Sequence, residues 1–160
     1  MEKVALLGLC LLIVFLGMRN YFIEIFERRN LIAHGEKYYT NKYISICEAN
    51  GSPKKCGKIG DKIDLTRKYM LESVDILAEF LILVVVSIWR KNFKDREAEA
   101  FGALNSVAYN FITDRRYAVA DRVLHHALSL KGTGCKEVHR RMMIVNRANA
   151  LKRMGNIEDS

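Results

Sequence analysis

The residues best suited to metal binding or nucleophilic chemistry lie in the last third of this 160-residue chain. They are two adjacent histidines, His125 and His126, followed by Cys135 and His139. Such side chains can ligate zinc or form a Cys–His pair. Adjacent residues point about 100° apart on a helix, so only one of the two histidines can face a given site. No acidic ligand completes the set, and no phosphate loop, serine elbow or zinc-protease motif occurs. The sequence therefore predicts a non-catalytic protein without a metal or cofactor.

A second pair of reactive side chains, Cys47 and Cys56, flanks the turn-rich segment EANGSPKK. Two thiols on either side of a Gly-Ser-Pro turn are typical of a short disulfide loop in an oxidising compartment. A zinc site would need four ligands at metal spacing, and only His34 lies nearby. We interpret the pair as a disulfide, with two free thiols as the alternative.

Three acidic residues, Glu72, Asp75 and Glu79, recur at three- and four-residue spacing, so a helix places them on one face. They fall in an apolar segment, where a charge is costly unless it is paired or faces a protein interior. If two antiparallel helices span a membrane here, Arg19 and Asp75 lie at similar depth. We therefore expect an Arg19–Asp75 contact, with Glu79 facing a partner helix or a second copy. In the alternative, the membrane begins near Ile76 and excludes the first two acids.

The first long apolar segment, Val4–Met18, contains no charged residue and would extend about 22 Å as a helix. A membrane-spanning helix needs about 20 residues, a length reached if the helix continues to Phe26. The alternative is a cleaved signal peptide. The residues before the segment are barely positive, however, and no small-residue cleavage site follows. We therefore predict a first transmembrane helix over residues 1–26.

The second apolar segment, Tyr69–Trp89, ends at an aromatic residue that Arg90 and Lys91 follow. An aromatic residue followed by basic residues is typical of a membrane interface, whereas the alternative is a helix buried inside a protein. We predict a second transmembrane helix over residues 69–89 and a basic junction over 90–97. Two such helices form a hairpin, which places both termini on the same side.

Charge alone does not orient this hairpin. The chain has a formal net charge of +8, and basic residues flank both ends of each predicted span. The disulfide interpretation puts the exposed loop over 27–68 in an oxidising compartment. The sequence thus predicts an integral protein of the inner or plasma membrane, in contact with lipid and with both termini in the cytoplasm.

Beyond the junction, apolar residues recur at helical spacing. In the first stretch they are Phe101, Leu104, Val107, Ala108 and Phe111. A second helical pattern follows over 117–130. Small residues at Ala108, Ala120 and Ala127 would let two helices approach closely. The sequence therefore predicts a helical hairpin within a C-terminal domain over 98–160.

The order of small and aromatic residues in this hairpin resembles that of the tetratricopeptide repeat (TPR). The residues that carry the resemblance are Ala108, Tyr117, Ala120, Ala127 and Leu128. The pattern begins again at Asn146, Ala148, Leu151, Gly155, Asn156 and Ile157. The two copies lie 40 residues apart, from Ala108 to Ala148, whereas a standard repeat has 34 residues. In the first repeat of this chain, Arg115 occupies the position at which a standard repeat has a turn glycine. The resemblance covers about one and a half repeats.

The resemblance implies a surface that binds a peptide or helix of a partner protein. The residues at the matching positions are Asn105, Tyr109, Ile112, Asn149, Lys152 and Arg153. A solvated helix end is the alternative reading of Lys152 and Arg153. So few repeats leave apolar residues exposed, which favours self-association or capping by a partner. The basic residues are scattered, so nucleic acid is the weaker candidate ligand.

Together these features predict an all-α protein with a transmembrane hairpin and a TPR-like domain, acting as a homo-oligomeric membrane adaptor or scaffold. The alternative is a membrane regulator or immunity-type protein that acts on another membrane protein through Asp75 and Glu79. An enzyme ranks third, because no set of titratable groups converges in the sequence.

Overall fold

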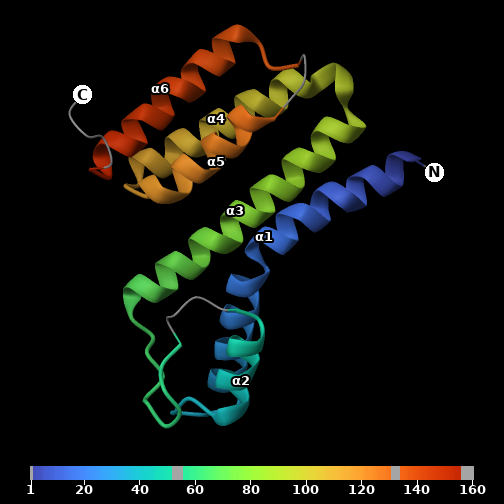
Figure 1. Ribbon diagram of the computed structural model, residues 1–160. Helices are drawn as coiled ribbons and strands as arrows, with labels where there is room; N and C mark the ends of the chain where they lie inside the picture. The colour runs from blue at the N-terminus through green and yellow to red at the C-terminus, as the bar shows by residue number, and fades with distance from the viewer. Residues whose placement is uncertain (1, 52–55, 131–133, 156–160) are drawn as a thin grey trace. The chain divides into compact units, whose positions relative to one another are not determined.

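The computed structural model describes residues 2–51, 56–130 and 134–155, with side chains described from Met18 onward. Within these ranges the chain folds into six α-helices and one short 3-10 helix, and its only β-type pairing is an isolated bridge between Tyr38 and Lys62. The chain divides into two compact units (Figure 1). One consists of residues 11–80, and the other of residues 1–10 and 81–160.

The predicted transmembrane hairpin is wrong. Helix α1 (Glu2–Ala33) and helix α3 (Arg67–Asn92) are long, but no helix in the described part of the chain is both long enough and apolar enough to cross a membrane. Charged residues are the physical reason in α3, since Glu72, Asp75 and Glu79 all fall inside it. This finding contradicts the predicted transmembrane helices over 1–26 and 69–89. It also contradicts the predicted membrane location and, with it, the predicted cytoplasmic termini. The side chains of Val4–Gly17 lie outside the described residues.

The unit of residues 11–80 is built from residues 11–33 of α1, the first half of α3 and the short helix α2 (Asn41–Ala49). Alternating apolar residues in the segment KYISI would also suit a strand, but the segment lies in α2. This helix begins where the Thr40 hydroxyl accepts a hydrogen bond from the Tyr43 N–H at 3.3 Å, an N-cap that satisfies one free donor. Tyr39, Tyr43 and Cys47 form a small buried core next to α1. Elsewhere in the unit, Phe22 of α1 meets Phe80 of α3 edge to face, with ring centroids 4.8 Å apart.

The second unit consists mainly of helices α4 (Glu97–Thr113), α5 (Tyr117–Ser129) and α6 (Glu137–Arg153), which follow α3 and the 3-10 helix η1 (Lys94–Arg96). The three helices pack against one another. Figure 1 shows α4 and α6 running in the same direction, with α5 antiparallel to both. Acidic residues in the first turns of α4 and α6, and basic residues in the last turn of α6, complement the helix dipoles.

Small residues hold α4 and α5 together as a helical hairpin. Ala108 of α4 and Ala120 and Ala127 of α5 are all buried. The turn between the helices contains Arg115 with φ of +60°, in the left-handed region that glycine adopts most easily. The sequence predicted this hairpin correctly, and Arg115 is the residue that stands at the expected glycine position. Asn156 and Ile157, which belong to the second copy of the pattern, lie outside the described residues.

Enlarging a buried alanine should separate these helices. We expect Ala120→Leu to lower the free energy of unfolding by about 1–3 kcal/mol, because extra methyl groups overfill a packed contact. Ala118→Leu is the matched control, since Ala118 lies on the exposed side of the same helix. Urea unfolding followed by circular dichroism measures both variants. Equal stability of the two would refute the close-packing account.

Candidate functional site

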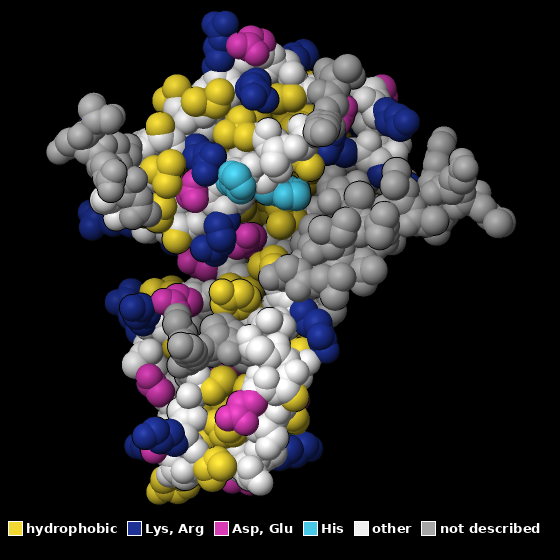
Figure 2. Space-filling model, viewed as in Figure 1, with side chains coloured by type: hydrophobic (Ala, Val, Ile, Leu, Met, Phe, Trp, Pro, Cys, Tyr) yellow, Lys and Arg dark blue, Asp and Glu magenta, His cyan; other side chains and the backbone are white. Residues whose placement is uncertain are grey.

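A groove with a volume of about 640 Å³ lies between α4 and α6 in the second unit. A volume of this size suits a bound side-chain cluster or a short peptide segment. Its lining comes from α4 through Asn105, Ser106, Tyr109 and Asn110, and from α6 through Arg141, Met142, Val145 and Asn146. In Figure 2, hydrophobic side chains lie among Lys and Arg over this unit.

Two asparagines tie the two sides of the groove together. Asn146 of α6 donates a hydrogen bond from its Nδ2 to the Oδ1 of Asn105 on α4, at 2.9 Å. Asn105 is buried, so the bond satisfies an amide that would otherwise be costly to remove from water. Above this pair the walls are apolar and solvent-facing: Tyr109 is 56% exposed, Met142 48% and Val145 66%. The groove thus combines a polar pair with an uncovered apolar surface.

The residues expected to bind a partner fall into three groups. Asn105 and Tyr109 line the groove. Ile112 is buried in the helical core and offers no surface. Asn149, Lys152 and Arg153 lie on the last two turns of α6. Arg153 donates a hydrogen bond to the Asn149 carboxamide at 3.1 Å and lies 5.9 Å from the Tyr117 ring centroid. Lys152 is exposed. The apolar run that contains Met142 and Val145 indicated exposed apolar surface, but the positions implied by the resemblance did not include this α6 wall.

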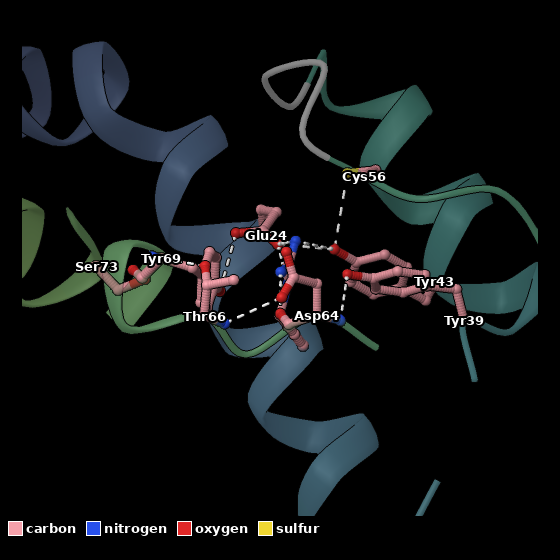
Figure 3. Close-up of polar contacts among 9 residues, drawn as sticks. Glu24, Tyr39, Tyr43, Cys56, Asp64, Thr66, Tyr69 and Ser73 are labelled. Carbon is pink, nitrogen blue, oxygen red and sulfur yellow. Dashed lines mark hydrogen bonds and ion pairs between the residues drawn. The ribbon is translucent and has the colours of Figure 1, made fainter. Parts of the chain in front are cut away.

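A second cluster of functional groups lies in the unit of residues 11–80 and centres on Glu24 of α1 (Figure 3). Arg28 is 2% exposed and donates to the Glu24 Oε1 from its Nε at 2.7 Å and from its Nη2 at 2.6 Å. Tyr43 of α2 donates to the same oxygen at 2.7 Å, and Tyr69 of α3 donates to Oε2 at 3.1 Å. One carboxylate therefore joins three helices.

Electrostatics in this cluster favour fixed protonation states. Burial is the largest influence on Arg28 and works against its charge, but Glu24, Tyr43 and Tyr69 together outweigh burial and raise the pKa of Arg28. Burial, and then the charge of Glu24, raise the pKa of Tyr69 to about 12. Burial and the hydrogen bond to Glu24 likewise raise the pKa of Tyr43. Neither tyrosine hydroxyl is therefore suited to act as a base near neutral pH. We interpret the cluster as an ion-pair network that stabilises the fold.

The predicted disulfide is also wrong, because Cys47 and Cys56 are both free thiols. Cys47 is buried against Tyr39 and Tyr43, and burial, with a hydrogen bond to Cys56, raises its pKa to about 12. A thiol at such a pKa stays protonated, and the thiolate is the form that reacts to make disulfides. The Cys56 Sγ lies 3.7 Å from the Tyr43 hydroxyl oxygen, whose proton is donated to Glu24. Pro53 of the intervening turn lies outside the described residues.

Gly57, in the loop before α3, lies directly against the ring of Tyr39. A Cβ atom on Gly57 would lie only 2.3 Å from the Cε2 of Tyr39. The Tyr39 ring is stacked on Tyr43 with centroids 5.0 Å apart, and its hydroxyl accepts a hydrogen bond from the Asp64 N–H at 3.3 Å. The loop can therefore approach the ring only because residue 57 has no side chain.

Arg19, Asp75 and Glu79, predicted to be polar groups within a membrane, differ in burial and in the helix that carries them. Arg19 donates from its Nη2 to the carboxamide of Asn50 at 2.7 Å, which joins α1 to the end of α2. Asp75 is half-buried and Glu79 is buried, both on α3.

The side chains of His125, His126, Cys135 and His139 do not come together as a metal site. Across residues 18–51, 56–130 and 134–155, whose side chains are described, no three His, Cys, Asp or Glu residues are placed to hold a metal ion. His125 is exposed, whereas His126, Cys135 and His139 are half-buried. Burial raises the pKa of the Cys135 thiol, which makes it a weak nucleophile. Burial, and then the charges of Arg90 and His125, lower the pKa of His126.

Removing the charge of Glu24 should destabilise its unit strongly. We expect Glu24→Gln to lower the free energy of unfolding by about 3–5 kcal/mol, because Arg28 would remain charged and buried without its anion. Glu27→Gln on the same helix is the matched control and should change stability little, since Glu27 is only half-buried. Chemical denaturation measures both variants. A Glu24→Gln protein as stable as the control would show that the network contributes nothing.

Acidification should weaken the second unit through His126. Because the folded protein lowers the pKa of this group, the unfolded chain binds its proton more readily. The stabilising contribution is therefore present above pH 6.5, the usual value, and is lost as the pH falls through the folded pKa. We expect His126→Gln to reduce this pH dependence of the unfolding free energy, whereas His125→Gln at the exposed neighbour retains it. An unchanged pH profile in His126→Gln would refute the assignment.

Comparisons of the chain with protein-family models, with curated proteins and with solved structures find no match. They therefore do not identify a TPR, and the TPR resemblance stands on the residues quoted above.

Proposed function

We propose that this chain is a non-catalytic interaction protein whose α4–α6 groove binds a segment of another protein. The single observation that carries the proposal is the uncovered apolar wall formed by Tyr109, Met142 and Val145 beside a hydrogen-bonded amide pair. Exposed apolar side chains that line a concave surface mark protein-binding grooves. Tyrosine is well suited to such a contact, because it adds large area at low entropic cost.

The arrangement of the three helices supports the resemblance to a TPR. In that interpretation α4 and α5 form one repeat and α6 begins the next, so the binding surface lies between α4 and α6. Both helices run in the same direction there (Figure 1). The groove lies on this surface, and it includes Asn105 and Tyr109, two of the residues that the resemblance implies.

A selected peptide ligand tests this proposal. Peptides of random sequence would be selected on the full-length chain, and their affinity measured by fluorescence polarisation. We expect Tyr109→Ala to weaken the selected peptides about 10-fold, as truncation of a central aromatic contact does. Phe93→Ala is the matched control, because Phe93 is a similarly exposed aromatic residue that does not line the groove. If both variants bind every selected peptide as tightly as the native chain does, the groove is not the binding site.

A further inference from the structure

Helix α6 has a strong excess of positive charge. It carries five basic residues, Arg140, Arg141, Arg147, Lys152 and Arg153, against the single acid Glu137. By contrast, α4 contains two acids and no Lys or Arg, and α5 contains one acid and one arginine. The excess therefore belongs to α6, the helix that forms one wall of the groove.

Only part of this charge is neutralised within the chain. Arg141 pairs with Glu137 at 2.8 Å, and Arg147 pairs with Asp121 of α5 at 2.7 Å. Arg140 and Lys152 are exposed, and Arg153 bonds only to the neutral Asn149 and lies over the Tyr117 ring. No carboxylate in the described part of the chain forms an ion pair with these three residues. Three cations on α6 thus remain available to an external anion.

The groove itself contains no carboxylate and only one cation among its eight lining residues. That cation, Arg141, already has an acidic partner. The remaining lining consists of amides, a hydroxyl and the apolar wall. A ligand in the groove therefore covers apolar surface, and it meets the free cations where it extends along α6 beyond the groove lining.

Two other occupants satisfy this description poorly. A second copy of the chain, docked through the same face, would bring the excess positive charge of one α6 against that of another, and like charges repel. Nucleic acid binds through many cations that contact successive phosphates, and it gains little from an apolar floor. An acidic protein segment matches both the apolar wall and the free cations.

We propose that the groove takes an amphipathic, acid-rich protein segment, a choice of ligand that rests on the function proposed above. Its apolar side chains cover Tyr109, Met142 and Val145, and its carboxylates lie against Lys152 and Arg153. Val145 and Lys152 are seven residues apart, which is two helical turns or about 10 Å along α6. A helical ligand would therefore place its acids about two turns from its apolar contacts.

The test uses three fluorescein-labelled peptides of about 16 residues, with the same leucines at helical spacing and with glutamate, glutamine or lysine at all other positions. Fluorescence polarisation with the full-length chain gives their affinities. We expect the glutamate peptide to bind about 10-fold more tightly than the glutamine peptide and the lysine peptide to bind most weakly. Raising the salt to about 0.3 M should remove most of this difference, because the free cations are exposed.

Paired charge variants locate the effect. Lys152→Gln with Arg153→Gln should weaken the glutamate peptide about fivefold or more and leave the glutamine peptide unchanged. Lys91→Gln with Lys94→Gln removes the same charge from the same unit outside the groove and should have no effect. Circular dichroism confirms that both double variants remain folded.

Each contrary result has a distinct meaning. If the glutamate and glutamine peptides bind equally and both are weakened by Tyr109→Ala, the groove binds proteins but the acidic preference is refuted. If no peptide binds while a labelled single-stranded oligonucleotide does, and Lys152→Gln with Arg153→Gln weakens it, the ligand is nucleic acid and both proposals fall. If no peptide binds and sedimentation shows a dimer that Val145→Asp dissociates, a second copy covers the groove and the acidic segment is overturned.

Discussion

A single buried carboxylate constrains the unit of residues 11–80. Glu24 is 5% exposed, and it accepts hydrogen bonds from Arg28 of its own helix, from Tyr43 of α2 and from Tyr69 of α3. A buried charge is tolerated only where its partners satisfy it, so the three helices must meet at this point. The Arg28 guanidinium extends the constraint to the loop, since it also donates to the Asp64 carbonyl at 2.8 Å. The described loop residues before α3 are therefore tied to α1 although they contain little regular structure.

The second unit depends on size rather than on charge. Its hairpin is held by alanines that let α4 and α5 approach, and α6 adds Met143 and Ala150 to the same core. Only one of the four consecutive apolar residues at 142–145 is buried there, Met143. The other three remain on the surface because a helix turns about 100° per residue and only one face can contact the hairpin. The exposed apolar wall of the groove is a direct result of this geometry.

The sequence predicted the parts of the fold that local pattern determines. Helical spacing and small residues identified the α4–α5 hairpin, and the expected turn position coincides with the left-handed Arg115. The apolar run over Tyr69–Trp89 was wrongly predicted to span a membrane, although its three acidic residues keep α3 from being apolar enough to do so. The burial of Glu79 within the protein depends on tertiary contacts, which local pattern does not give. The Glu24 network was missed for the same reason: its members lie up to 45 residues apart, between Glu24 and Tyr69. In the groove, Asn105 and Tyr109 were anticipated from a resemblance, whereas the α6 residues depend on how that helix is rotated against α4.

The contact between Gly57 and the Tyr39 ring has a consequence for how this gene can change over time. A methyl group at position 57 would displace a ring that is stacked on Tyr43, which in turn bonds to Glu24. Selection that maintains the buried ion pair therefore also acts on a loop position with no charge and no side chain. Neighbouring exposed positions such as Lys58 are free to drift, while the codon for residue 57 is confined to glycine. Gly57 should therefore change more slowly than the exposed loop positions around it.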